Sequence, residues 1–358
     1  MPVPDQDATP PGWDEGWERA WDARRAAGTA PGLVPVRVVR IDKGGITVAA
    51  TPADKRLVVA AKAVRRVVVG DVCGLDPEAG RIEVILPRRT VFERRAPGAE
   101  RDDLAVGSKA LAANMDVVLV LQALDAGVNS ARLAREMVLA WESGARPVVV
   151  LTKADLVGPG HLGVQRRLAE RFAPGVPVVC VSADASGGTR ELEPHLPPGT
   201  VAVLMGASGA GKSTLANTLA GHRIQLTAEV RGGDQRGRHT TTAGQMLPLE
   251  GGRWLIDTPG IRGVGLWHCD HGLELAFADL APWAEACRFV DCSHSSEPGC
   301  GILEAIERGE LERDRLDTWH TLVAEVEALE DSAELQQRLD RREANQRARR
   351  KAAARRRR

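Results

Sequence analysis

The residues best suited to chemistry form a glycine-rich loop in the middle of the chain. Residues 206–214 run Gly-Ala-Ser-Gly-Ala-Gly-Lys-Ser-Thr, which fits the pattern G-x-x-x-x-G-K-[ST]. Glycines let successive backbone N–H groups point at phosphate oxygens, and the dipole of the following helix adds to that attraction. The apolar run 201–205 and the helix-compatible stretch 214–220 flank the loop as the pattern requires. The loop therefore predicts phosphate binding, and this context disfavours the alternative of a chance glycine-rich turn.

Individual residues of the loop have candidate roles. Lys212 would neutralise the β- and γ-phosphates, and the Ser213 hydroxyl would bind Mg²⁺. A second segment, Asp257-Thr258-Pro259-Gly260, lies downstream, where a switch that senses the γ-phosphate is expected. The predicted phosphate-side contacts are Gly206, Ala207, Ser208, Gly209, Ala210, Gly211, Lys212, Ser213, Thr214, Asp257 and Gly260.

Two segments upstream of the loop predict which base is bound. The Asp155 carboxylate, just after the β-branched run 147–151, can accept from both N1–H and the exocyclic amine of guanine. Adenine would leave that carboxylate unsatisfied. An Asp at a strand end is often only a helix cap, so the inference depends on the segments occurring together. The aliphatic stem of Lys153 would lie over the base, and a second strand end could place backbone N–H groups near guanine O6. The predicted base contacts are Thr152, Lys153, Ala154, Asp155, Ser182 and Ala183.

These segments occur in an unusual order, because both base-reading segments precede the phosphate loop. In this order and in its motifs the chain resembles the ribosome small-subunit-dependent GTPase A family, whose GTPase domain is circularly permuted. The likeness runs from about Leu33 to the cysteine cluster near Cys300, and it includes Gly-Arg-His-Thr-Thr-Thr at 237–242 and Asp-Thr-Pro-Gly-Ile-Arg at 257–262. The resemblance implies an N-terminal OB-type barrel, a permuted GTPase domain and a C-terminal zinc domain. It also implies maturation of the small ribosomal subunit, with GTP hydrolysis stimulated by that subunit.

Hydrolysis needs a group that orients water, and the usual position lacks one. Many GTPases place a Gln directly after the Asp-x-x-Gly segment, whereas this chain has Ile261 there. We therefore expect slow intrinsic turnover that another segment or a partner accelerates. His239 is the candidate for positioning the water, with a contact to ribosomal RNA or packing of the switch as the alternative. Thr240 would join Mg²⁺ in the GTP state, so that His239, Lys212 and Thr240 form the predicted catalytic set.

A second cluster of reactive side chains follows the switch. Its spacing is Cys287-x4-Cys292-x-His294-x5-Cys300, which offers three thiolates and one imidazole. Four protein ligands complete a tetrahedral Zn²⁺ site and leave no position for water, so we expect one structural zinc ion. Disulfides are the alternative, which a cytosolic chain disfavours. A looser group lacks a fourth ligand and is interpreted as chance proximity; it comprises His268, Cys269 and His271.

The elements around these motifs predict several domains. Short β-branched runs between Leu33 and Leu86, one of them at 64–69, suit a five-stranded barrel. Alternating strand and helix patterns then predict a doubly wound α/β domain. Trp13, Trp17 and Trp21 would form a helical stripe that docks on a neighbouring domain or, alternatively, binds a partner. The predicted division is a Trp-striped extension at 1–32, an OB-fold barrel at 33–90, the permuted GTPase domain at 98–268, a mostly helical zinc-binding domain at 269–337 and a basic tail at 338–358.

Charge and composition are compatible with this interpretation. The net charge is zero, yet residues 338–358 carry eleven Lys or Arg against Asp340 and Glu343, which is typical of an arm that binds phosphate backbones. Basic residues of the barrel region are expected to add to an RNA-binding surface; they include Arg37, Arg40, Lys55 and Arg56. No apolar run is long enough to span a bilayer, and no signal peptide begins the chain, so a cytoplasmic protein without a membrane partner is expected.

The leading hypothesis is a monomeric GTP hydrolase that binds GTP or GDP, the small ribosomal subunit and its rRNA. One alternative is an RNA-binding scaffold in which the nucleotide is only structural. Another is a P-loop ATPase or kinase, against which Asp155 and the permuted order argue. A DNA-binding regulator is least favoured, because the cysteine cluster lacks the spacing and recognition helix of a finger.

Overall fold

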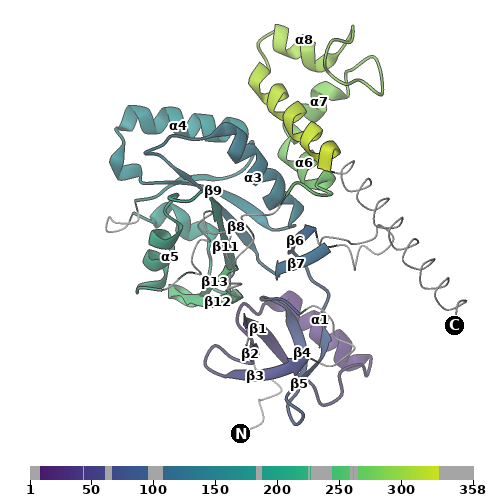
Figure 1. Cartoon of the computed structure of the whole chain (residues 1–358), viewed down its shortest axis with the longest axis vertical. Coiled ribbons are helices and arrows are strands. Elements are labelled where there is room, and N and C mark those ends of the chain that lie inside the picture. Colours follow the sequence, from purple (N-terminus) through teal and green to yellow (C-terminus); the bar gives the residue numbers. More distant parts are fainter. Residues whose placement is uncertain are drawn as a thin grey trace, which may run out of the picture. The chain divides into compact units, whose positions relative to one another are not determined.

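The computed structural model groups the chain into two compact units (Figure 1). Unit 1 comprises Met1–Phe92 and Ala110–Gly263, and unit 2 comprises Glu93–Lys109 and Val264–Arg358. The structure describes residues 9–42, 44–60, 67–95, 108–182, 188–224, 226, 244–258, 261 and 265–329. None of the described helices combines the length and the apolar character needed to cross a bilayer. The predicted domain limits stay predictions, and the basic tail lies outside the described residues.

A closed five-stranded barrel begins unit 1. Its strands pair in the order β1-β2-β3-β5-β4, and β4 pairs with β1 to close it. Alternating side chains fill the interior, with Val36, Val48 and Ile82 almost fully buried. The five strands are β1 (Val34–Asp42), β2 (Gly45–Ala49), β3 (Lys55–Ala60), β4 (Val72–Asp76) and β5 (Arg81–Ile85). The barrel expected from the β-branched runs is therefore present.

The run at 64–69 does not become a barrel strand in its described part. Residues 67 and 68 have no regular structure, and Val69 makes only an isolated bridge to Ala112. Residues 64–66 lie outside the described ones. A β-branched composition alone could not distinguish a strand from this connection, because β-propensity reports fit to a half-buried surface.

The tryptophans of the N-terminal extension pack on the barrel. Helix α1 (Glu15–Ala26) begins at Asp14, whose carboxylate accepts a hydrogen bond from the backbone N–H of Trp17. Trp17 and Trp21 are buried together with Val72 of β4, while Trp13 precedes the helix and is half-buried. The stripe therefore serves docking within unit 1.

The rest of unit 1 is an α/β sheet with the order β10-β9-β8-β11-β13-β12. All neighbours are parallel except β12 and β13, which are antiparallel. The parallel strands are β8 (Val117–Ala123), β9 (Arg146–Thr152), β10 (Val178–Cys180), β11 (Val201–Gly206) and β13 (Arg253–Asp257), and β12 spans Gly244–Leu249. Their carboxyl ends meet at one edge of the sheet, where ligands bind in such folds.

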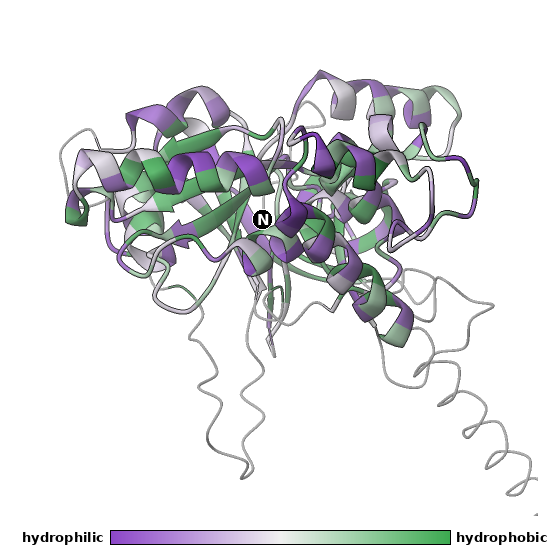
Figure 2. Cartoon of the chain, turned by 90° about the horizontal axis from the view of Figure 1, so that it is seen from above, coloured by the Kyte–Doolittle hydropathy of each residue, from purple (hydrophilic) through white to green (hydrophobic). Residues whose placement is uncertain are grey.

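Both faces of this sheet are covered, which explains the continuous apolar runs of its strands. Val117, Leu119 and Leu121 of β8 belong to one buried cluster with Leu215 and Leu219 of helix α5 (Lys212–Ala220). The alternating residues of β8 are equally buried on the other face, where α3 (Ser130–Glu142) packs against α4 (Pro159–Phe172). In Figure 2 the helices alternate between hydrophilic and hydrophobic colours, as expected of helices with one buried face.

The barrel and the α/β sheet are continuous. Strand β1 pairs antiparallel with β12 through Arg40↔Gln245 and Ile41↔Gly244. The result is a single sheet of eleven strands that runs from β10 to the barrel strand β4. The barrel is therefore attached to the α/β part by main-chain hydrogen bonds as well as by side chains.

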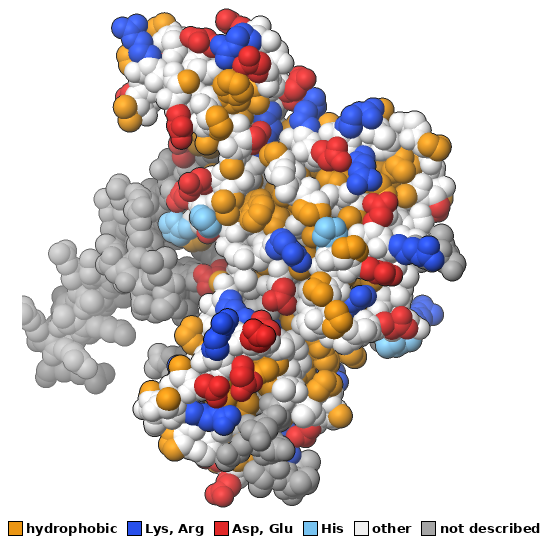
Figure 3. Space-filling model, turned by 180° about the vertical axis from the view of Figure 1, so that it is seen from behind, with side chains coloured by type: hydrophobic (Ala, Val, Ile, Leu, Met, Phe, Trp, Pro, Cys, Tyr) orange, Lys and Arg blue, Asp and Glu red, His pale blue; other side chains and the backbone are white. Residues whose placement is uncertain are grey.

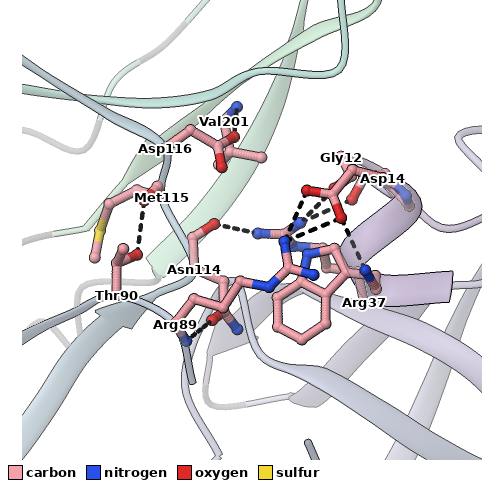
Figure 4. Close-up of polar contacts among 11 residues, drawn as sticks. Gly12, Asp14, Arg37, Arg89, Thr90, Asn114, Met115, Asp116 and Val201 are labelled. Atoms are coloured by element: carbon pink, nitrogen blue, oxygen red, sulfur yellow. Dashed lines mark hydrogen bonds and ion pairs between the residues drawn. The ribbon is translucent and has the colours of Figure 1, made fainter. Parts of the chain in front are cut away.

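A buried guanidinium holds the same junction further along β1 (Figure 4). Arg37 is 1% exposed and donates to the carbonyl oxygens of Pro11, Gly12 and Asn114. Asn114, which has a positive φ of 58°, also donates from its side chain to the Gly70 carbonyl, 3.1 Å away. Burial lowers the pKa of Arg37 to about 10, against the opposing effect of nearby Asp116, so the side chain stays charged at neutral pH. One charge thus joins the N-terminal extension, the barrel and the segment that leads into the first α/β strand, β8.

The position of Arg37 corrects the expected basic surface. The side chain is interior, and two other members of that set, Arg40 and Arg56, pair with Asp42 and Asp54. On the face drawn in Figure 3, side chains of both signs are interspersed. Sequence could not predict this, because an Arg in an apolar strand is usually solvated and only tertiary contacts supply three buried carbonyl acceptors.

The described part of unit 2 consists mainly of helices. They are α6 (Asp270–Ala276), α7 (Ala281–Ala284) and α8 (Gly301–Glu307), followed by a helical stretch at 313–329. Arg315 is buried and bonds to both carboxylate oxygens of Asp279, while its guanidinium lies 4.0 Å from the ring centroid of Phe277. This contact joins the long helix to the α6 region within the unit.

The close packing between the barrel and the segment before β8 predicts that a single methyl group added at Gly70 lowers the stability of unit 1. A Cβ there would lie 1.9 Å from the Ala113 carbonyl oxygen, and the φ of +91° disfavours any side chain. Gly70→Ala should lower the stability of unit 1 by about 2 kcal/mol or more, as the drop in thermal midpoint would reveal. Gly80→Ala is the matched control, since Gly80 has a φ of +60° with nothing within 4 Å. Equal losses in the two variants would contradict a close approach at Gly70.

Candidate functional site

The glycine-rich loop joins β11 to α5 at the carboxyl edge of the sheet. Gly209 and Gly211 have φ values of 79° and 84°, which L side chains rarely adopt. A Cβ on Gly206 would lie 2.7 Å from the Leu121 carbonyl oxygen of neighbouring β8. The loop is therefore pinned against β8 at its start, and it ends at the N-terminus of an α-helix, where backbone N–H groups attract anions.

Lys212 is the first residue of α5 and its side chain folds back over the loop. It is 5% exposed, and its Nζ donates to the carbonyl oxygens of Gly206, at 2.8 Å, and Ala207. The ammonium therefore lies among the backbone groups that would surround phosphate oxygens. The neighbouring Ser213 and Thr214 are exposed at the start of the helix.

The segment predicted to read the base is hydrogen-bonded to the glycine-rich loop. Thr152, the last residue of β9, donates from Oγ1 to the Ala210 carbonyl at 2.9 Å. The same hydroxyl lies 3.4 Å from the Gln122 carbonyl oxygen at the end of β8. Thr152 is 3% exposed, so these contacts are shielded from water. Residues 58 positions apart are thereby fixed in one site.

Beyond Thr152 the backbone turns so that two side chains reach solvent. Lys153 has a φ of 59°, and its Nζ lies 2.6 Å from Asp125 Oδ2, a carboxylate that follows β8. Asp155, in the turn Ala154–Leu156, is exposed at the same edge. The Ala154 N–H donates to the Val181 carbonyl, which places Ser182 beside the segment. The sequence analysis did not identify Asp125 as a site residue. The only feature of the sequence that could have indicated it is an acidic residue close to the end of a buried strand.

The predicted switch segment follows β13, which borders β11 on the side opposite to β8. Asp257, Thr258 and Ile261 line one small cavity together with Lys212. Ile261 is 3% exposed, so its side chain is packed rather than directed to solvent. The predicted site residues Ala183, His239, Thr240 and Gly260 lie outside the described residues.

A buried carboxylate behind the loop was not anticipated from sequence. Glu136 of α3 is 8% exposed and accepts a hydrogen bond from Gln122 Nε2 at 2.8 Å. Burial raises the pKa of Glu136 to about 7, although the charges of Arg132 and Lys212 oppose the shift. Gln122 also accepts from the Asn129 N–H, the residue that caps α3. The Gln122–Glu136 pair therefore connects α3 to the end of β8, which is the neighbour of β11, the strand that precedes the glycine-rich loop.

The cysteine and histidine side chains of unit 2 converge. All four donor atoms of Cys287, Cys292, His294 and Cys300 lie within 4.8 Å of one another. The Sγ atoms of Cys287 and Cys300 are 3.9 Å apart, and His294 Nδ1 is 3.5 Å from each of them. Tetrahedral coordination with metal–sulfur bonds of about 2.3 Å requires edges of about 3.8 Å. These four residues can hold a metal ion, and no second such group occurs in the described parts of the chain.

A neighbouring carboxylate shapes the loop that carries these potential metal ligands. Glu297 accepts hydrogen bonds from Ser293 N, Ser295 N and Ser296 N at 2.9, 3.0 and 3.1 Å, and from the Ser293 hydroxyl. The Ser293 hydroxyl and then these backbone donors hold the pKa of Glu297 well below its usual range. His294 has a φ of 58°, so its ring is presented from a left-handed residue inside this loop. The loop is thus bent by Glu297 between the second and fourth potential ligands.

The glycine-rich loop, the strand end predicted to read the base and the predicted switch turn share one edge of the α/β sheet in permuted chain order, and this arrangement defines a circularly permuted P-loop GTPase. A family model described as RsgA GTPase matches residues 85–267. The chain belongs to the RsgA GTPase family and is a GTP hydrolase.

Relatives and solved structures agree with this assignment. The small ribosomal subunit biogenesis GTPase RsgA of Streptomyces coelicolor is 43% identical over 321 residues, which cover 88% of this chain and 85% of that protein. The protein of the same name from Methanosarcina acetivorans is 40% identical over 75% of this chain and 72% of its own. The crystal structure of YjeQ from Thermotoga maritima matches with a TM-score of 0.62 and 25% identity, covering 82% of this chain and 98% of that one. YloQ, a circularly permuted GTPase, shares the fold with a TM-score of 0.58 and 19% identity, covering 84% of this chain and 96% of that one.

The raised pKa of Glu136 predicts a pH dependence of stability. The folded-state pKa of about 7 exceeds the ordinary value of 4.5, so the folded protein holds this proton more tightly than the unfolded chain does. Stability should therefore fall as pH rises between about 4.5 and 7. Glu136→Gln should remove that loss and raise stability at pH 8 by on the order of 1–3 kcal/mol. Denaturant unfolding across this pH range checks the prediction, with exposed Glu170→Gln as the control. A wild-type slope in Glu136→Gln would refute it.

Proposed function

We propose that this GTPase acts in late maturation of the small ribosomal subunit, binding GTP with Mg²⁺ and contacting rRNA. The observation that carries the proposal is the extent of the similarity to proteins named small ribosomal subunit biogenesis GTPase. It covers 88% of this chain and is not confined to the GTPase part. Hydrolysis on the subunit would release the protein, because the GTP state is the one that would bind.

The phosphate side of the site has assignable roles in this proposal. Lys212 would leave its carbonyl partners to neutralise the β- and γ-phosphates, and Ser213 would bind Mg²⁺. The backbone N–H groups of 206–214 would surround the phosphates, and Asp257 would approach the metal and the γ-phosphate.

The base side follows from the strand end at Thr152. Asp155 would accept from guanine N1–H and the exocyclic amine, and the stem of Lys153, held by Asp125, would cover the base. Ser182 and Ala183 would complete the pocket near guanine O6. The hydrogen bond between Thr152 and Ala210 supports these roles, since it places base and phosphate contacts at a fixed separation.

The hydrolytic step would depend on residues outside the described ones. We assign His239 to the attacking water, Thr240 to Mg²⁺ and Gly260 to the γ-phosphate, as the sequence predicts. The buried Ile261 supports slow intrinsic turnover, because it offers no group to orient water. The subunit would then act as the activator.

The metal in unit 2 would be a single structural Zn²⁺. Three thiols and one imidazole at tetrahedral spacing favour zinc, and four protein ligands leave no open position for catalysis. Loss of hydration, and then the neighbouring Cys300 and Cys287, raise the pKa of the Cys292 thiol to about 11. Deprotonation of this thiol is therefore unfavourable without a metal, and a bound cation would offset that unfavourable free energy.

The remaining features suit an RNA-bound protein. We infer a cytoplasmic monomer whose partners are the small subunit and its rRNA, and whose tail at 338–358 adds contacts to phosphate backbones. The second candidate is an RNA-binding scaffold with a structural nucleotide. The packing of Ile261 at the position of the usual catalytic Gln is the observation that favours it.

Nucleotide hydrolysis with and without isolated small ribosomal subunits tests the proposal. The subunits should stimulate GTP turnover by roughly tenfold or more and leave ATP unhydrolysed. Asp155→Asn is the matched variant, because an amide cannot accept both guanine protons, and GTP affinity should fall by roughly a hundredfold. Binding of GTP without stimulation would favour the scaffold. Turnover of ATP would overturn the guanine assignment.

Metal removal tests the zinc assignment separately. The purified chain should contain a single equivalent of zinc, and Cys292→Ser should lose it and unfold unit 2 at lower temperature, since metal binding contributes to folding. Cys180→Ser, which changes a half-buried cysteine of β10, is the control that should keep its zinc. Metal analysis and thermal unfolding provide the two measurements. Full zinc content in Cys292→Ser would rule out this ligand set.

A further inference from the structure

One strand connects the barrel to the switch turn. On one side of β12, Gln245 pairs with Asp257, the first residue of that turn. On the other side the same Gln245 pairs with Arg40 of barrel strand β1. A shift of the turn would therefore act directly on the strand that the barrel also holds.

Side chains from both neighbours meet at Gly244, the first residue of β12. A Cβ placed on Gly244 would lie 3.0 Å from Val69 Cγ2 and 3.2 Å from Thr258 Oγ1. Val69 belongs to the barrel connection and Thr258 follows Asp257 in the switch turn. The absence of a side chain at Gly244 lets these two residues approach the same point of the strand.

Val69 is held in place independently of the nucleotide site. Its carbonyl accepts from the Ala113 N–H at 3.0 Å, and the next residue, Gly70, donates to the Val38 carbonyl at 2.9 Å. The segment is closed by Asp71, whose buried carboxylate accepts from the Val68 N–H and pairs with Arg88 at 2.7 Å. Val69 itself is 2% exposed. It therefore presents a rigid surface to β12.

Thr258, by contrast, is held by packing. Its hydroxyl is buried and has no hydrogen-bond partner among the described residues. Thr258 and Asp257 border the same cavity as Lys212, so a displacement here would change the γ-phosphate side of the site. Because no described residue makes a hydrogen bond to the Thr258 hydroxyl, the packing around Gly244 contributes to the position of this side chain.

We propose that Val69, in the connection between barrel strands β3 and β4, is a positioning residue for the Asp257–Thr258 turn, so that the barrel takes part in the discrimination between GTP and GDP. This inference rests on the proposed GTP-dependent function and adds its regulation. GDP lacks the γ-phosphate that the turn senses, so a change at Val69 acts on GTP affinity and spares GDP affinity. By thermodynamic linkage, a ligand bound more tightly by the barrel in one nucleotide state shifts the GTP/GDP preference by the same factor.

Val69→Ala in the full chain is the direct test. We expect affinity for a non-hydrolysable GTP analogue to change by roughly fivefold or more, while affinity for GDP stays within about twofold. Val58→Ala is the matched control, because Val58 is also a buried valine of the barrel and pairs with β2 rather than β12. The control should lower the thermal midpoint without changing the ratio of the two affinities.

A second variant keeps the test valid if Val69→Ala does not fold. Gly244→Ala inserts a methyl group at the contact from the β12 side and should also change the affinity ratio. Unchanged ratios in the variants that fold would overturn the positioning role and leave GTP binding itself intact. Failure of the wild-type chain to bind the GTP analogue would instead overturn the proposed function, and the inference with it.

Discussion

The site depends on the hydrogen bond from Thr152 Oγ1 to the Ala210 carbonyl, because it ties the strand end that would read the base to the loop that would hold the phosphates. The bond can form only because β8, β9 and β11 are parallel neighbours whose carboxyl ends reach the same edge. Parallel strands need both faces covered, and α3 and α5 provide that cover from opposite sides. The site is therefore a consequence of how the sheet is packed.

This constraint explains why the permuted chain order is tolerated. A nucleotide contacts strand ends that are adjacent in space, and their adjacency is set by strand order in the sheet, not by order along the chain. Between the barrel and β8 the chain passes through strands β6 (Val91–Arg95) and β7 (Ser108–Ala113), and Asn114 and the buried Arg37 hold the segment that enters β8.

The two units differ in the size of their hydrophobic cores and therefore in what stabilises them. Unit 1 buries continuous apolar strands and extends its sheet into the barrel, so that much of its stability comes from a large core. Unit 2 has a small core of helices around the Cys287–Cys300 cluster, which could hold a metal ion, and its buried Arg315 is paired with Asp279. The predicted switch turn belongs to the first unit and is attached to the barrel through β12.

The sequence by itself determined the phosphate loop, the barrel, the α/β pattern and the four potential metal ligands, because each is encoded by local spacing and periodicity. It also determined the family, through the order of its motifs. Tertiary structure alone decided the burial of Arg37 and Glu136 and the pairing of β1 with β12. These features join residues distant along the chain, and whether a charged side chain is solvated or enclosed depends on neighbours that only folding brings together.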